Sequence, residues 1–304
     1  MARMTDDSPA QPETGFDRLL SFSIPDRDCR GRAVRLGPVL DEILGAHDYP
    51  PAIKHVLAEA LLVTTLMGGL LKEEDDQLTM QAQTEGGVIE LLVCDYRNGE
   101  LRGYVQHDRE RFDALGADTS LESLFGKGFL AITFDIAKTG QRYQGVVPLE
   151  GGSLAEAVEA YFARSEQVPT IVTAAIHSNV ANCVAAGMLV QHLPEGEEGR
   201  ERLHARLDHP EWEHVATMAR SLAKDELIEQ TLSLEALIWR LYHQEREVRV
   251  EQGNALSRGC RCTHVHFEEV LARFPKEDRR EMANENGIIL VDCAFCSKQF
   301  AIED

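Results

Sequence analysis

Four of the seven cysteines form two close pairs near the C-terminal end of the chain, Cys260-x-Cys262 and Cys293-x-x-Cys296, with 30 residues between the pairs. A tetrahedral zinc site needs four soft ligands, and cysteines one or two residues apart let a single tight turn direct two sulfurs at one ion. Thiolates are also the nucleophiles of redox chemistry. The spacing therefore predicts a zinc site, a thiol switch, or both.

The alternative is that these four residues are unrelated core cysteines, because a free cysteine is more often a small buried hydrophobe than a ligand. Two such pairs in one short segment favour the metal site, with one zinc ion per chain bound by Cys260, Cys262, Cys293 and Cys296. If an oxidant acts on these thiols, the simplest local pairing is Cys260–Cys262 and Cys293–Cys296. The first pair is so close that its disulfide would close a small strained ring, which favours a switch.

Other candidate residues carry weaker signals. His264 and His266 follow Cys262 closely and are competing ligands, although four thiolates already complete a tetrahedron and surface imidazoles at a helix entry are the alternative. Cys94 and Cys183 lie in apolar segments and are predicted to be core residues. Cys29 lies among arginines that would lower its pKa, or it is a plain loop thiol.

Composition limits the classes of protein. A length of 304 residues predicts two units, or one large unit with an appendage. A net charge of -20 disfavours partners that are nucleic acids or anionic membranes, since both require a basic surface. The first 15 residues are polar without a secretory signal, and the longest apolar run has 11 residues. Seven cysteines without a secretory signal predict a cytoplasmic protein that uses thiols for metal or redox chemistry.

Hydrophobic periodicity predicts the elements that carry these residues. Apolar residues at three- and four-residue spacings predict helices over 52–66, 154–165 and 232–247. Alternating or compact apolar segments predict strands over 78–83, 88–96, 101–106, 129–136, 143–147 and 170–178. Strands in succession predict an α+β fold with a largely antiparallel sheet packed with helices.

The domain organisation follows from shifts in composition. We expect a flexible tail over 1–15, an α+β core domain over 16–194, a helical linker over 195–248 and a small redox-switch zinc module over 249–304. The linker carries only a thin apolar stripe, so its helices are expected to bury little. This pattern is consistent with a helical bundle of ordinary stability and equally with a connector near its folding threshold. The final segment is too short to bury much surface, so a metal would stabilise it.

The chain resembles the redox-regulated heat-shock holdase family, the bacterial chaperone of about 33 kDa. The spacing of the four cysteines is the most specific part of the resemblance, and all four are present. Family-like segments are also found at 71–72, 78–81, 102–105, 145–149, 186–194 and 241–245. Departures are Ala186-Gly187 where the family often has paired glycines, and Arg261 where small polar residues are usual.

The resemblance implies an ATP-independent chaperone that is inactive while reduced and zinc-bound. After combined oxidation and unfolding stress such a protein forms dimers and captures unfolding client proteins, which prevents their aggregation. An enzyme is not expected, because the sequence contains no phosphate-binding glycine loop, nucleophile elbow or His-Glu-x-x-His motif. A constitutive zinc ribbon that binds a protein or nucleic acid is the alternative function.

Overall fold

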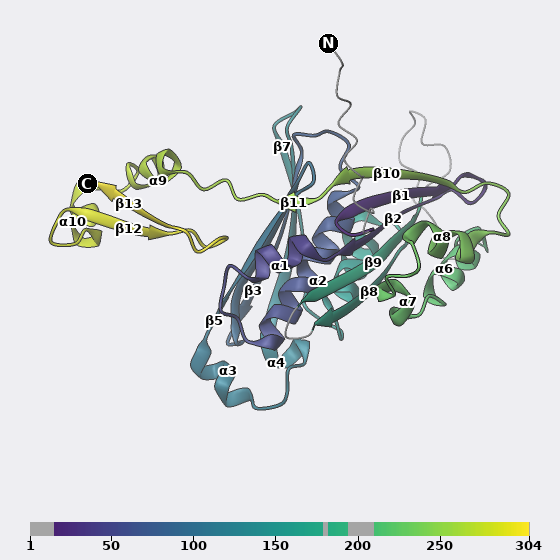
Figure 1. The fold of residues 1–304 in the computed structure, drawn as a ribbon, viewed down its shortest axis with the longest axis horizontal. Coiled ribbons are helices and arrows are strands. Elements are labelled where there is room, and N and C mark those ends of the chain that lie inside the picture. Colours follow the sequence, from purple (N-terminus) through teal and green to yellow (C-terminus); the bar gives the residue numbers. More distant parts are fainter. Residues whose placement is uncertain (1–14, 179–181, 194–209, 304) are drawn as a thin grey trace, which may run out of the picture.

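The computed structural model describes residues 15–178, 182–193 and 210–303. Two large, mainly antiparallel sheets and several helices form the body, and a C-terminal arm carries a small two-stranded sheet (Figure 1). This arrangement confirms the predicted α+β fold class. Of the predicted tail only Gly15 is described, and the predicted linker is described from Pro210 onward.

The first large sheet, sheet A, has the strand order β10-β1-β2-β9-β8. Its strands are β1 (Arg18–Ile24), β2 (Cys29–Leu36), β8 (Thr170–Ser178), β9 (Cys183–His192) and β10 (Arg249–Ala255). All neighbours are antiparallel. Of these strands the periodicity predicted only β8. In β9 every residue is buried, because both faces of the sheet are covered, so the strand lacks a period-two pattern.

The second large sheet, sheet B, has the order β11-β5-β4-β3-β6-β7 and is antiparallel except for the parallel pair of β11 and β5. Its strands are β3 (Gln77–Glu85), β4 (Ile89–Arg97), β5 (Glu100–His107), β6 (Lys127–Ile136), β7 (Gln141–Pro148) and β11 (Ser257–Arg258). Five of the six were predicted. The turn between β4 and β5 has φ of 46° at Asn98 and 80° at Gly99, which confirms the predicted Asn-Gly hairpin.

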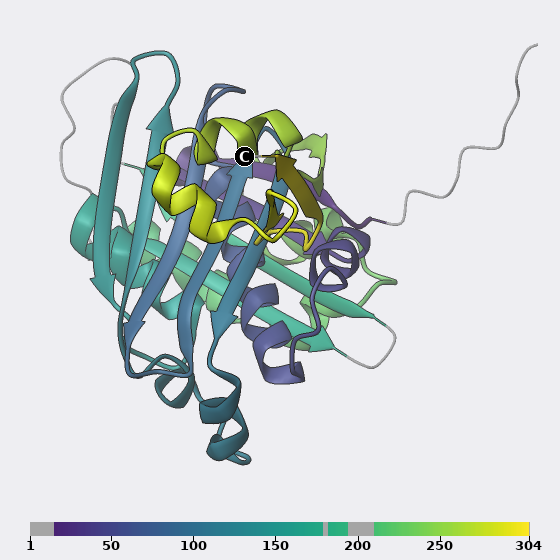
Figure 2. The same cartoon turned by 90° about the vertical axis from the view of Figure 1, so that its left-hand side faces the viewer.

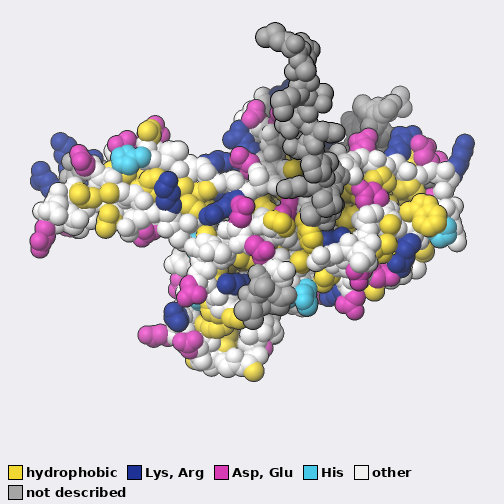
Figure 3. Space-filling model, viewed as in Figure 1, with side chains coloured by type: hydrophobic (Ala, Val, Ile, Leu, Met, Phe, Trp, Pro, Cys, Tyr) yellow, Lys and Arg dark blue, Asp and Glu magenta, His cyan; other side chains and the backbone are white. Residues whose placement is uncertain are grey.

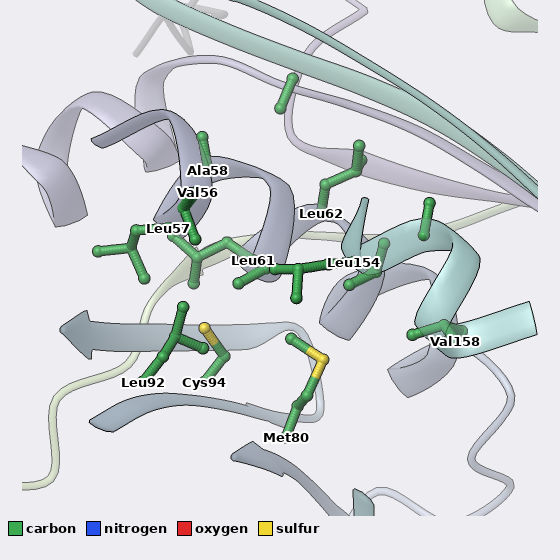
Figure 4. Packing of buried hydrophobic residues seen from close by; sticks show 14 of the residues in the cluster. Val56, Leu57, Ala58, Leu61, Leu62, Met80, Leu92, Cys94, Leu154 and Val158 are labelled. Carbon is green, nitrogen blue, oxygen red and sulfur yellow. The ribbon is translucent and has the colours of Figure 1, made fainter. Parts of the chain in front are cut away.

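Helix α2 (Pro51–Gly68) lies between the two sheets and confirms the predicted helix over 52–66. The sequence predicted a single buried face, but every residue from Val56 to Gly68 is buried because sheets cover both sides. Figure 4 shows side chains of α2 and sheet B in contact, with the Cys94 thiol beside Leu57 and Leu61. Shorter helices flank this core: α1 (Pro38–Leu44), α3 (Arg109–Leu115), α4 (Leu121–Phe125) and α5 (Leu154–Tyr161), the last extended by a π-helical turn.

Three linker helices cover the face of sheet A that points away from α2: α6 (Pro210–Arg220), α7 (Lys224–Ile228) and α8 (Leu234–Tyr242). The expectation that these helices bury little is wrong for the described part. Trp212, Val215 and Ala219 are at most 5% exposed and pack on the sheet with side chains of α8. A thin apolar stripe is enough to bury these helices because it packs on the flat apolar face of sheet A. The linker sequence does not reveal that face.

The C-terminal arm contains α9 (His264–Leu271), α10 (Lys276–Met282), β12 (Ile288–Asp292) and β13 (Gln299–Glu303). It lies in front of sheet B when the molecule is turned by 90° (Figure 2). Strands β10 and β11 pair with β1 and β5 of the body, so the chain leaves the body only at Gly259. The module boundary at residue 249 stays a prediction. Among the described residues no helix is long and apolar enough to cross a membrane.

Candidate metal centre

The structure brings together the four cysteines of the two pairs. Their Sγ atoms all lie within 4.8 Å of one another, although the pairs are far apart in the sequence. Cys260 and Cys262 follow β11, and Cys293 and Cys296 lie in the turn between β12 and β13. In that turn the amide of Ser297 donates to the Cys293 carbonyl at 2.8 Å, and Ser297 has φ of 55°. This tight turn directs the second pair of sulfurs at the first.

The distances between sulfurs fit a tetrahedral thiolate site. Cys260 Sγ lies 3.2 Å from Cys262 Sγ and 3.6 Å from Cys293 Sγ, and the Sγ atoms of Cys262 and Cys296 are 3.4 Å apart. A zinc–sulfur bond of about 2.3 Å gives a tetrahedral edge of roughly 3.8 Å. Four soft donors at nearly this spacing suit zinc, and the short contacts run both within and across the pairs.

The surroundings of Cys260, Cys262 and Cys293 shift the pKa of each of these thiols. Burial acts to raise the pKa of Cys260, but hydrogen bonds from the backbone of Cys262 and from the other thiols outweigh it and lower the pKa to about 7. Burial, together with those same thiol contacts, raises the pKa of Cys262 and of Cys293. Further thiolates therefore need a compensating positive charge, which a divalent cation provides.

The module that carries the sulfurs has a small apolar core. Its buried members are Leu271, Ile289, Cys293, Phe300 and Ile302. The ring of Phe267 packs on Phe300 with centroids 4.9 Å apart. A core of this size rarely stabilises a fold alone, so a module of this kind usually needs a metal ion or a crosslink.

The two histidines lie outside this cluster. Both belong to α9, in which the backbone amide of His266 donates a hydrogen bond to the Thr263 side chain. His264 is exposed, with Nε2 3.0 Å from the Ala301 carbonyl and Nδ1 3.2 Å from Glu268. The interpretation of these residues as surface imidazoles at a helix entry is confirmed by their exposure.

The remaining cysteines are buried in the body. Cys94 and Cys183 are core residues, as predicted. The expectations for Cys29 are wrong, because it lies in β2 rather than a loop and is buried. Burial, followed by the charge of Asp28, raises the pKa of Cys29 to about 12, which outweighs the opposing effect of Arg27. The flanking arginines indicated a reactive thiol only because the sequence does not reveal burial.

Several residues around the centre were not predicted as site residues, although the segment 102–105 was noted as family-like. Arg102 and Tyr104 of β5 contact the ring of Phe295, which lies between Cys293 and Cys296. The signal available beforehand was the position of Phe295 inside the second cysteine pair. Arg102 and Tyr104 lie in a strand far from Phe295 in the sequence, so the spacing of the cysteines did not reveal this contact.

Fold and site together define an α+β protein with a four-cysteine module on a separate C-terminal arm. The family model described as Hsp33 protein matches residues 17–303. The chain is 36% identical over 301 residues to the 33 kDa chaperonin of Caulobacter vibrioides, covering 96% of this chain and 97% of that protein. It is 34% identical over 293 residues to the 33 kDa chaperonin of Pseudomonas aeruginosa, covering 94% and 92%.

The chain therefore belongs to the Hsp33 family of chaperones. The crystal structure of the 33 kDa chaperonin from Thermotoga maritima has a similar fold, with a TM-score of 0.77 at 21% identity, and the match covers 94% of this chain and 95% of that one. These matches confirm the resemblance inferred from the cysteines and the family-like segments.

Proposed function

We propose that this protein is a redox-regulated, ATP-independent holdase. It is inactive while Cys260, Cys262, Cys293 and Cys296 are reduced and bind one zinc ion, and it binds unfolding proteins once these residues form two disulfides. The cluster of four Sγ atoms within 4.8 Å carries the proposal. The small apolar core of the module makes its fold depend on these sulfurs.

The metal has a structural role in this proposal. A bound zinc ion keeps the four sulfurs deprotonated and in a tetrahedral arrangement, and in finger-like peptides it contributes on the order of 10 to 16 kcal/mol. That contribution is comparable to the stability of a whole small domain. The module over 249–304 is accordingly assigned as the switch, beside a core over 16–194 and a linker over 195–248.

Peroxide is the oxidant class that fits the chemistry. In each pair one thiolate attacks a peroxide oxygen, the O–O bond breaks, hydroxide leaves, and the sulfur becomes a sulfenic acid. The second thiolate attacks that sulfur, the S–S bond forms, and a second hydroxide leaves; both hydroxides take up protons to give water. Pairing Cys260 with Cys262 and Cys293 with Cys296 consumes two peroxide molecules per chain. The resulting disulfides no longer offer thiolate ligands.

Loss of the ligands connects to client binding through the linker. The part of the module that carries the cysteines follows β10, which pairs with β1 at the edge of sheet A, and α6 to α8 cover the face of that sheet. When the module loses its structure, these neighbours lose support, and apolar side chains of α6 and of sheet A become available. Hydrophobic contact is non-directional, so such a surface accepts many clients. Dimer formation after oxidation would enlarge it further.

A single assay tests the proposal. The reduced, zinc-loaded chain should not suppress light scattering by a chemically denatured client, and peroxide with mild heat should release about one zinc ion per chain and give suppression. Zinc release is followed with a chromogenic chelator in the same sample. If the reduced form suppresses scattering equally well, the protein is a constitutive chaperone. If oxidation releases zinc without suppression, a structural zinc ribbon is the better account.

The negative charge and the thiol chemistry support a cytoplasmic protein without nucleic-acid or membrane partners.

A further inference from the structure

The arm extends away from the body and touches it at one end (Figures 1 and 3). The contacts at this end involve residues next to the cysteines in the sequence. Two of the residues enclosed by the cysteine pairs, Arg261 and Phe295, contact sheet B at this end. We propose that these two residues seat the metal centre on the outer face of sheet B, so that this sheet stabilises the metal-bound arrangement of the sulfurs. The inference rests on the zinc site of the proposed function and assigns it positioning residues in the core domain.

Phe295 makes the closest contacts. Its ring lies edge-on to Tyr104 of β5, with centroids 4.9 Å apart and planes at 84°, and the Arg102 guanidinium carbon lies 4.0 Å from its centroid. Edge-to-face aromatic pairs and cation–π contacts both stabilise such an arrangement. Because Phe295 is the residue before Cys296, its ring position restrains the turn that presents the second pair of sulfurs.

The backbone of this turn is also attached to the body. His47, which follows α1, has Nε2 3.3 Å from the Phe295 carbonyl and Nδ1 3.0 Å from Ser297 Oγ. With a hydrogen on Nε2, the imidazole donates to the carbonyl and accepts from the serine hydroxyl. His47 is itself stacked on Tyr49, with centroids 4.7 Å apart. The imidazole of His47 therefore contacts the residues on both sides of Cys296.

Arg261 holds the first cysteine pair. Its Nη1 donates to Gln77 Oε1 at 2.6 Å, and its Nε lies 3.8 Å from a carboxylate oxygen of Glu100. The preceding backbone is fixed as well, because the Gly259 amide donates to the Leu101 carbonyl at 2.9 Å. Cys260 thus comes directly after the last backbone hydrogen bond to β5.

Polar side chains on sheet B join the two contact points. Gln77 donates to Thr79 at 3.1 Å, and Thr79 donates to Asp95 at 2.7 Å. Asp95 is buried and forms an ion pair with Arg102 at 2.6 Å, which holds the guanidinium over the Phe295 ring. The sheet thereby orients both halves of the sulfur cluster without contributing a ligand, as outer-shell partners do at other metal sites.

Thermodynamic linkage gives a consequence that can be measured. If the seated conformation binds metal better than the unseated one, removing a seating residue from the sheet must weaken metal retention. Tyr104 is the residue to change, because it belongs to the core domain and lies outside the module. An edge-to-face pair of this kind corresponds to roughly a fivefold change in an equilibrium or a rate.

The test measures zinc release from the reduced, zinc-loaded full chain to a chromogenic chelator. Tyr104→Ala should release zinc about fivefold faster than the unmodified chain, while Tyr104→Phe, which keeps the ring, should behave as the unmodified chain does. Tyr143→Ala is the matched control, because Tyr143 lies on β7 of the same sheet with 55% of its surface exposed. Tyr104→Leu provides a second variant that keeps apolar bulk in case the alanine variant fails to fold, which circular dichroism would reveal.

A double-variant cycle separates seating from a general loss of stability. Phe295→Ala should also accelerate release, and adding Tyr104→Ala to it should produce no further acceleration, because the two rings act through one contact. The inference is overturned if Tyr104→Ala and Tyr104→Leu both release zinc at the rate of the unmodified chain. It is also overturned if the acceleration in the double variant equals the product of the accelerations in Tyr104→Ala and Phe295→Ala. If the reduced, unmodified chain retains no zinc, both the proposed function and the seating are overturned. If it retains zinc equally well with and without the Tyr104 ring, only the seating is overturned.

Discussion

Arg35 of β2 donates to the main-chain carbonyl of Leu227 through both Nε and Nη2, at 2.9 and 2.7 Å. Its Nη2 also lies 2.9 Å from the carbonyl of Glu229 and 3.2 Å from that of Leu232. The side chain is buried, and burial lowers its pKa. One guanidinium thus donates to three carbonyls, one in the last turn of α7 and two in the segment that joins α7 to α8, where the linker lies on sheet A.

We expect Arg35→Met to weaken the attachment of the linker. Several carbonyls would lose their donor in a buried place, which costs about 3 kcal/mol of unfolding free energy. Denaturant titration of the reduced protein measures this change, and limited proteolysis should show faster cleavage within residues 210–242. Arg249→Met is the matched control, since Arg249 is exposed on β10 of the same sheet. Equal stability of the two variants would contradict the role of Arg35.

The two tryptophans test the packing of the linker helices. Trp212 of α6 is 5% exposed and stacks on His192, with centroids 5.9 Å apart, whereas Trp239 of α8 is 66% exposed. Trp212→Ala should lower the unfolding free energy by about 3 to 5 kcal/mol, because a large buried side chain is removed. Trp239→Ala should change it by less than about 0.5 kcal/mol, as exposed positions usually do. Similar effects at both sites, measured by chemical denaturation, would show that α6 is not packed on sheet A.

Replacement of one cluster cysteine tests the metal site. In Cys293→Ser a hard hydroxyl takes the place of a soft thiolate, so zinc content after dialysis against a chelator should fall from about one ion per chain to near zero. Atomic absorption measures the metal, and near-ultraviolet and far-ultraviolet circular dichroism report the loss of structure in the arm. Cys183→Ser is the control, because Cys183 lies in the core away from the cluster and its variant should keep zinc.

Cys29 should make stability depend on alkaline pH. Its thiol has an ordinary pKa of 9.0 when unfolded, and burial raises the pKa to about 12 in the fold. The folded state therefore holds the proton more tightly, so this contribution is fully present below pH 9 and is lost as pH rises from 9 to about 12. Over that window the unfolding free energy of the unmodified chain should fall more steeply with pH than that of Cys29→Ala. The difference between the two slopes should be about 1 kcal/mol per pH unit.

The control for this pH dependence is Cys183→Ala. Burial raises the pKa of Cys183 to about 11, so the contribution of that thiol should be lost over a window that ends about one unit lower. Parallel stability curves for the unmodified chain and Cys29→Ala would mean that the Cys29 thiol is accessible to water in the fold.

Some features of the site and fold could be read from local patterns. The two cysteine pairs were recognisable because a metal turn needs ligands only one or two residues apart, and the pairs do meet in space. Strands β3 to β7 were recognisable because β3 to β5, and again β6 and β7, pair with their neighbours in the chain. One face of the sheet is less buried than the other, and an Asn-Gly turn joins β4 to β5. The chaperone family followed from the cysteine spacing and the shared segments.

Other features depend on contacts between distant parts of the chain. Burial of Cys29 results from the helices packed over β2, and the packing of Trp212 results from a sheet face contributed by five separate segments. The contact of Phe295 with Tyr104 joins residues almost two hundred positions apart. Periodicity records which side of an element is apolar but not which partner covers it, so the surroundings of these side chains emerged only from the assembled fold.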